Sequence, residues 1–226
     1  MVIQGKFDVG REALKWIAIA TMTVDHVGAI FYPNYVVLRI IGRISFPLFS
    51  YLAVLGVETT RNVKKYFIKL LLFGFISQIP FYLAIGSGIF EHLNIFFTLS
   101  FGVLFILFLE KKSLWFVLPI LVSFLNFDYG VYGILLIGSM HILRKDKKTG
   151  IAAVVLLNLL FLFQWSLQIF SLLALPIILL HNSGFLKKVN EPKGKTSYPV
   201  WRIYFFYVYY PIHLALFYLF KLYYFH

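Results

Sequence analysis

About nine continuous apolar segments follow one another along this chain, and this succession limits its fold more than any other feature. The segments are residues 13–31, 36–57, 66–85, 93–109, 114–127, 129–143, 151–163, 167–180 and 201–224. A helix of about 17–25 residues crosses the hydrocarbon layer of a bilayer. The runs lack the period-two alternation of membrane strands. We therefore predict an all-α, polytopic integral membrane helix bundle with about nine transmembrane segments. The segments between 114 and 181 are short, so a re-entrant pair remains an alternative there.

The composition agrees with a membrane protein. Hydrophobic residues make up 61% of the chain, charged residues 13%, and the mean hydropathy is +0.84. Soluble domains are about 45–50% apolar, and a water-soluble chain of this size could not bury so much apolar surface. The absence of cysteine excludes disulfides, thiolate catalysis and cysteine-ligated metals. We expect one domain over residues 1–226 and no metal.

Basic residues occupy every second connection between the apolar segments. These connections are residues 6–15, 61–69, 111–112, 144–148 and 187–202. The intervening connections contain no lysine. Because positive residues accumulate in cytoplasmic loops, the pattern predicts a cytoplasmic N-terminus and an outer C-terminus. It makes residues 183–200 a cytoplasmic loop. It also explains the net charge of +12 without nucleic-acid binding.

Several polar residues lie where topology does not require them. Asp25 and His26 fall in the outer half of the first segment, and Arg39 and Arg43 lie four residues apart on one face of the second. The other polar residues expected in the same leaflet are Gln78, Asn94, Asp128 and His213. Ionisable groups at membrane depth are costly and usually serve a site. We therefore predict that these residues converge on a functional site.

Simpler roles exist for most of these residues. Asp25 and Arg43 suit an interhelical ion pair, Asp128 a turn, and Asn94 a helix cap. His213 suits the membrane interface. Glu58, His141 and His181 fall at cytoplasmic ends of segments, where solvation explains them, so we leave them outside the site.

The imidazole of His26 is the candidate general base. An unperturbed histidine has a pKa of about 6.5, so it exchanges a proton near neutral pH. Adjacent residues on a helix point about 100° apart, so Asp25 need not touch His26. The sequence leaves open whether Asp25 orients the imidazole or holds Arg43 while Asp128 or His213 serves His26.

Lys15 and His26 are eleven residues apart, a rise of about 16 Å on a helix. This distance joins the cytoplasmic surface to the outer half of the membrane. A cytosolic donor held by its phosphates near Lys15 would reach His26 through a phosphopantetheine arm. An acyl-CoA donor therefore fits the spacing, although Lys15 also suits a positive-inside anchor.

Seven motifs, taken together, resemble the TraX family of membrane acetyltransferases, named for a protein linked to pilin N-acetylation. They are LKWIAIATMTVDHVGAIFYP at 14–33, IGRISFPLF at 41–49, GVETTRN at 56–62, SQIPF at 77–81, LNIFFTL at 93–99, DYGVYG at 128–133 and YPIHL at 210–214. The family is similar to larger groups of membrane acyltransferases, including glycan O-acyltransferases and heparan glucosaminide N-acetyltransferase. In the glycan group a basic residue, ten residues and a histidine mark the first helix. Lys15 and His26 fit that spacing, with lysine in place of the commoner arginine.

The resemblance implies a bacterial cytoplasmic membrane enzyme that moves an acetyl group from acetyl-CoA to an amine or hydroxyl of a surface protein or glycan. It implies His26 as the catalytic histidine or acetyl carrier, and Lys15 as a residue on the CoA side. The other candidates are Asp25 as a catalytic residue, with Arg39, Arg43, Gln78, Asn94, Asp128 and His213 binding substrate or donor. A homo-oligomer in the bilayer is an alternative to a monomer.

Two other functions fit the same residues. A proton-coupled transporter or flippase would use Asp25, Arg43 and Asp128 as a proton pathway. It would move its substrate without CoA. A structural subunit of a surface-assembly machine would tolerate the loss of His26, Arg43 and Asp128 together.

Overall fold

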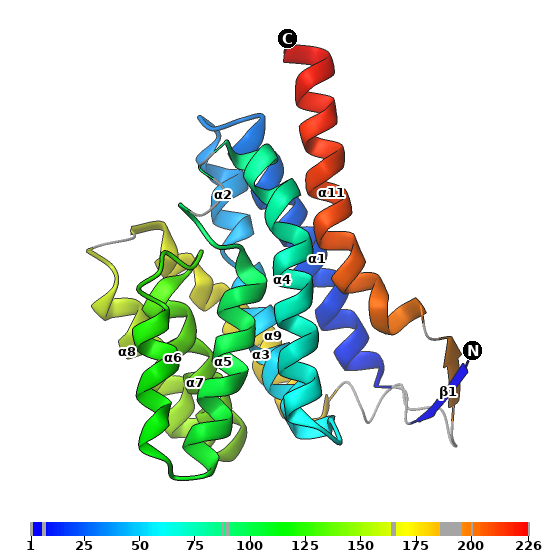
Figure 1. Ribbon diagram of the computed structural model, residues 1–226. Coiled ribbons are helices and arrows are strands. Elements are labelled where there is room, and N and C mark those ends of the chain that lie inside the picture. Colours follow the sequence, from blue (N-terminus) through cyan, green and yellow to red (C-terminus); the bar gives the residue numbers. More distant parts are fainter. Residues whose placement is uncertain are drawn as a thin grey trace.

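A computed structural model of the protein, describing residues 2–5, 8–86, 88, 91–163, 166–185, 196–199 and 201–225, is a bundle of helices (Figure 1). The helices of the first half are α1 (Val9–Ile30), α2 (Val36–Gly42), α3 (Ser45–Thr59), α4 (Val63–Ile85) and α5 (Ile95–Glu110). Then come the 3₁₀ helix η1 (Leu114–Phe116), α6 (Val117–Val122), α7 (Gly130–Lys145), α8 (Lys147–Leu160), the 3₁₀ helix η2 (Ser166–Leu173), α9 (Ala174–Asn182) and α11 (Trp201–Phe225).

Two short strands join the N-terminal arm to the segment before α11. Strand β1 (Val2–Gly5) pairs antiparallel with β2 (Thr196–Pro199). The sequence predicts a loop at residues 183–200, so β2 adds regular structure that the prediction lacks. Most of that loop, residues 186–195 and 200, lies outside the described residues.

Every predicted apolar segment contains helix. Three helices in the described ranges are long and apolar enough to cross a membrane, namely 36–59, which combines α2 and α3, Val63–Ile85 and Tyr204–Tyr224. Helix α1 is as long as these, but Lys15, Asp25 and His26 reduce its apolar character. The segments at 114–127 and 167–180 are broken into 3₁₀ and short α-helical pieces. The all-helical membrane character is thus supported, while the count of nine spans and the orientation stay predictions.

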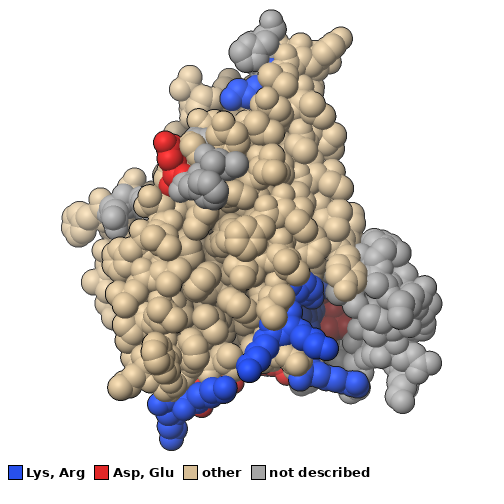
Figure 2. Space-filling view, viewed as in Figure 1, with Lys and Arg blue, Asp and Glu red and all other residues tan. Residues whose placement is uncertain are grey.

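The basic connections lie at one end of the bundle. Ion pairs join the end of α7 to two other helices there: Arg144 to Glu58 of α3 at 2.8 Å and Lys145 to Glu110 of α5 at 3.5 Å. In the space-filling view, most of the lysines and arginines gather along the lower edge, beneath a broad surface with few charges (Figure 2). We call this the basic end.

Two histidines at the basic end are buried, so the expectation that solvent surrounds them is wrong. His181 is 4% exposed, lies 3.1 Å from the Tyr51 hydroxyl, and faces the carboxylate of Asp8. His141 is 6% exposed and faces Glu110 at 3.4 Å. Neighbouring helices cover these ends, since α9 packs on α3 and α7 packs on α5. Sequence position alone does not reveal that cover.

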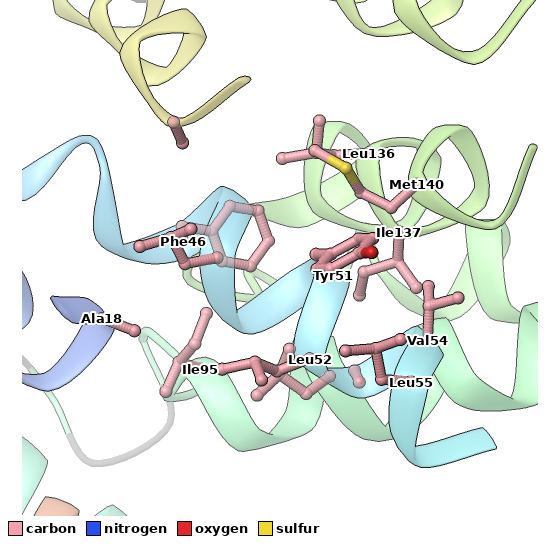
Figure 3. Close-up of a cluster of buried hydrophobic side chains, with 14 of the residues drawn as sticks. Ala18, Phe46, Tyr51, Leu52, Val54, Leu55, Ile95, Leu136, Ile137 and Met140 are labelled. Atoms are coloured by element: carbon pink, nitrogen blue, oxygen red, sulfur yellow. The ribbon is translucent and has the colours of Figure 1, made fainter. Parts of the chain in front are cut away.

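Helix α3 is the centre of the core. Residues from Ser45 to Val57 are buried on nearly every face of this helix, as expected of a helix that is apolar all round. Figure 3 shows Ala18 of α1, Ile95 of α5 and Met140 of α7 converging on it. The other helices therefore surround α3, and their polar residues collect near its two ends.

Side chains cap the start of several helices. Asp8, Asn62, Asn94 and Asp146 each accept a hydrogen bond from a backbone N–H of the first turn. This satisfies donors that a helix leaves without an internal partner. At Asp146, hydrogen bonding from the Thr149 hydroxyl lowers the pKa of the carboxyl group. Asn94 is therefore a helix cap, which is the simpler role considered for it from the sequence.

Candidate functional site

Close packing of α1 against α2 builds the first part of the site. A Cβ atom on Gly28 would lie 2.7 Å from Leu38, and one on Gly42 would overlap the side chain of Asp25. The two glycines therefore let the helices approach closely. This approach sets the arginine-bearing face of α2 directly against Asp25.

Both carboxylate oxygens of Asp25 are bound by arginine. Arg39 donates to Oδ2 at 2.9 Å and Arg43 to Oδ1 at 3.2 Å. The Asp25 and Arg43 side chains are 13% and 15% exposed. The interhelical ion pair considered from the sequence is thus present, with Arg39 added. Among the described residues, no hydrogen bond or ion pair joins the side chains of Asp25 and His26, so the predicted catalytic role of Asp25 stays a prediction.

A buried hydrogen-bond network continues from Arg43 into the bundle. Arg43 donates to the side-chain oxygen of Gln168 in η2 at 3.3 Å, and Gln168 donates to the Tyr132 hydroxyl of α7 at 3.1 Å. Tyr132 in turn donates to Asn158 of α8 at 3.2 Å. Buried polar groups need such partners. The network fixes the irregular segment η2 beside the arginine.

His213, not Asp128, is the partner of His26. Nδ1 of His26 lies 2.7 Å from Nε2 of His213, and the two rings are nearly parallel, with an interplanar angle of 13° and their centroids 5.0 Å apart. Nδ1 of His213 lies 2.9 Å from the backbone oxygen of Tyr209. The sequence left this pairing open because α1 and α11 lie at opposite ends of the chain.

These contacts assign the protons on both rings. A carbonyl oxygen only accepts, so Nδ1 of His213 carries a proton and donates to Tyr209. In the neutral ring Nε2 of His213 is then an acceptor, and Nδ1 of His26 donates to it. The lone pair of His26 therefore lies on Nε2. This is the arrangement that a general base requires.

His26 lines a cavity of about 620 Å³ at the end of the bundle opposite the basic end. We call it the outer cavity. The predicted site residues on its wall are Asp25, His26, Arg39, Arg43 and Asp128. His92, Tyr129 and Gln168 are also on the wall.

Asp128 reaches this cavity from a turn. Its backbone N–H donates to the oxygen of Leu93 at 2.8 Å, and Asn126 just before it has a φ of 58°. The turn role considered from the sequence is thus correct, and it coexists with a place on the cavity wall.

A second cavity, of about 420 Å³, opens at the basic end. We call it the basic cavity. Its cationic residues are Arg11, Lys15, Lys69 and Arg202. Lys15 forms an ion pair with Glu12 at 2.6 Å and lies over the ring of Phe206. The sequence explained Arg11 and Lys69 by topology alone, but here both also face a cavity.

The two cavities lie back to back. Met22, Phe49, Ile95 and Tyr210 line both of them. We call these four residues the neck. The side chains of the neck thus lie between the basic cavity and the outer cavity, which His26 lines. In the sequence analysis, none of the four received a role, because apolar and aromatic residues are everywhere in this chain.

Gln78 and Asn94 line neither cavity, although they were predicted to bind substrate or donor. Asn94 donates to Gln78 Oε1 at 2.8 Å and to the backbone oxygen of Gly74 at 2.7 Å. Gln78 donates to the backbone oxygen of His92 at 2.8 Å. These bonds hold α5 against α4, which supports a structural role for both residues.

Replacing Asn94 by alanine should lower the free energy of unfolding by about 2–4 kcal/mol, measured by thermal unfolding in detergent. The loss combines a cap, about 1 kcal/mol, with two buried hydrogen bonds from the Asn94 side chain to Gln78 and Gly74, about 0.5–1.5 kcal/mol each. Asn62 caps α4 from an exposed position and is the matched control. Its alanine variant should lose the cap contribution alone. Equal losses in both variants would contradict the structural role of the Gln78–Asn94 pair.

Within the described ranges, no group of three or more histidine, aspartate or glutamate side chains is placed to hold a metal ion. The ionisable groups are the His26–His213 pair, Asp25 with its two arginines, and Asp128 on one side, and four cations beside the carboxylates of Asp8 and Glu12 on the other. These groups suit proton transfer in the outer cavity and anion binding in the basic cavity.

One known protein matches this chain along most of its length, and another matches a short part of it. A probable fimbrial assembly protein FimC, serogroup H1, of Dichelobacter nodosus is 29% identical over 231 residues, covering 92% of this chain and 94% of its own. An uncharacterised protein of Rickettsia prowazekii (strain Madrid E) is 44% identical over 43 residues, which are 19% of this chain and 17% of its own. No solved structure matches. The family model described as TraX protein matches residues 10–221. The chain thus belongs to the TraX protein family.

Proposed function

We propose that this protein is a membrane acetyltransferase. Acetyl-CoA would bind in the basic cavity, and an amine or hydroxyl acceptor would bind in the outer cavity. The observation that carries the proposal is the pair of cavities back to back across the neck, with cations in one and the His26 imidazole in the other. A donor and an acceptor that enter from opposite sides require such an arrangement.

The basic cavity has the charge that a CoA molecule needs. CoA carries a diphosphate and a further phosphate, and the cavity offers two arginines and two lysines against the carboxylates of Asp8 and Glu12. Arginine binds phosphate with a two-pronged fork, whereas lysine acts as a point charge. Arg11 and Arg202 therefore supply the fork that Lys15 lacks. From Lys15, the pantetheine arm would extend along α1 for about 16 Å to His26.

The outer cavity contains the imidazole of His26, which is the base that the proposed transfer needs. Nε2 of His26 would take the proton from the acceptor amine or hydroxyl, whose nitrogen or oxygen attacks the thioester carbon. The carbon–sulfur bond then breaks, and the CoA thiolate recovers a proton from the imidazolium. His213 holds the tautomer through Nδ1 of His26. Asp25 with its two arginines, and Asp128, would position the acceptor in the outer cavity.

The comparisons support the biological setting. Membership of the TraX family and similarity to a probable fimbrial assembly protein favour a surface protein as the acceptor. We place the protein in the bacterial cytoplasmic membrane as a multi-pass protein, with its basic end toward the cytoplasm, because positive residues favour that side.

Calorimetry with acetyl-CoA tests the proposal on purified protein in detergent. Lys15→Ala and Lys69→Ala should each weaken binding by about tenfold, because each removes a charged contact worth about 1.5 kcal/mol. Lys64 carries the same charge at the same end but is exposed and lines neither cavity. Lys64→Ala should therefore bind as the wild type does.

The outcomes separate the proposal from its rival. Weaker binding in both cavity variants, with Lys64→Ala unchanged, supports acetyl-CoA as the donor. A folded wild-type protein that binds no acetyl-CoA would overturn the proposal and favour the proton-coupled transporter.

A further inference from the structure

Tyr210 occupies an unusual place for a polar group. Its side chain is 3% exposed, and it lines both the basic and the outer cavity. The ring packs edge-to-face on His26 with centroids 6.0 Å apart and on His213 at 5.5 Å. Any group that passes from the basic cavity to His26 therefore passes this residue.

The hydroxyl of Tyr210 is buried without a hydrogen bond in the described part of the chain. The backbone of Ile95 approaches this oxygen but lacks the geometry of a hydrogen bond. A buried hydroxyl without a partner is costly, and native structures retain such a group where it has a function. Phenylalanine occupies many other buried positions of this chain, so the presence of a hydroxyl at Tyr210 indicates a ligand.

The N-terminus of α5 lies at the same neck. Ile95 is the first residue of this 16-residue helix and lines both cavities. The backbone N–H groups of a first turn have no acceptor inside their own helix, and the helix dipole places partial positive charge there. Asn94 satisfies the N–H of Phe96, the residue after Ile95. At the neck, the Tyr210 hydroxyl thus lies close to the positive N-terminal end of α5.

We propose that the Tyr210 hydroxyl, beside the N-terminus of α5, binds the carbonyl oxygen of the acetyl group as it crosses the neck. This inference rests on the proposed acetyltransferase function and assigns that reaction a further catalytic residue. When the acceptor attacks, the carbonyl carbon becomes tetrahedral and its oxygen gains negative charge. Tyr210 keeps its proton and donates a hydrogen bond to that oxygen, and the carbonyl re-forms as the bond to sulfur breaks. Donors preorganised for such an oxyanion accelerate acyl transfer.

The test compares Tyr210→Phe with the wild type in proteoliposomes, using acetyl-CoA and glycinamide as the amine acceptor and measuring CoA release. Removing one oxyanion donor should lower kcat about 10²–10³-fold. The KM for acetyl-CoA and its calorimetric Kd should stay unchanged, because the basic cavity keeps its cations. The variant should unfold at the same or a higher temperature, since the hydroxyl that it loses is buried without a hydrogen bond in the described part of the chain.

Tyr218→Phe is the matched control. Tyr218 lies on α11 two turns beyond Tyr210 and lines neither cavity, so its loss should leave kcat unchanged. If Tyr210→Phe retains wild-type kcat while the wild type releases CoA, the inference is overturned and the proposed function stands. If both kcat and the Kd for acetyl-CoA change together, Tyr210 binds the donor rather than the oxyanion, which also overturns it. A wild type that neither binds acetyl-CoA nor releases CoA overturns both.

Discussion

His26→Ala should lower the rate of acetyl transfer by about 10²–10⁴-fold, the range lost with a general base. The alanine variant has no lone pair at the position of Nε2, so the acceptor keeps its proton and attacks slowly. Binding of acetyl-CoA should persist, because Arg11, Lys15 and Lys69 lie in the other cavity. CoA release in proteoliposomes and calorimetry in detergent measure the two effects separately.

Two further histidine variants sharpen this test. His213→Phe keeps an aromatic ring against His26 but removes the acceptor that sets its tautomer, so it should cost less than His26→Ala. His141 is buried at the basic end and lines neither cavity, so His141→Ala should leave the rate unchanged. A His26→Ala protein with full transfer activity would refute the assignment of His26 as the general base.

Asp25→Asn should lower the free energy of unfolding by about 3–5 kcal/mol, the usual effect of removing one partner of a buried ion pair. Asparagine matches the shape of aspartate, so packing against Gly42 is kept. Arg39 of α2 and Arg43, which directly follows α2, lose the carboxylate that both bind. Thermal unfolding in detergent measures the change.

A control and a second substitution isolate the electrostatic cause. Glu110→Gln breaks an ion pair with Lys145 at the exposed basic end and should cost under about 1 kcal/mol. Adding Arg43→Gln to Asp25→Asn should recover part of the stability, because one uncompensated charge is removed. An Asp25→Asn protein of normal stability that fails to transfer acetyl would instead give Asp25 the catalytic role that the sequence indicated.

The sequence predicts the helical part of this fold well, for a clear physical reason. Apolar runs must be covered by lipid or by other helices, and all nine predicted runs contain helix. The sequence alone does not establish how many of these apolar runs cross the membrane. Residues 114–127 form a 3₁₀ turn and a six-residue helix, and residues 167–180 are part 3₁₀ helix. Composition cannot distinguish such broken segments from full spans.

The site was only partly readable from the sequence. Asp25, His26 and Arg43 were recognisable because ionisable groups are rare in apolar helices. Their partners depend on packing between distant segments, so the pairing of His26 with His213 stayed open. Tyr210 gave no signal, since α11 is rich in tyrosine and phenylalanine. Polarity alone also drew Gln78 and Asn94 into the candidate site, although both bind each other.

The bond between His26 and His213 has a consequence for biosynthesis. The two residues are 187 positions apart, on α1 and on α11. During translation the ring of His26 enters the membrane early, and it meets its partner after every other helix of the bundle has been made. A ribosome stalled before α11 leaves a membrane-inserted protein in which nothing holds the proton of His26 on Nδ1. The His26 tautomer that the proposed transfer requires is therefore fixed at the end of synthesis, when α11 packs against α1.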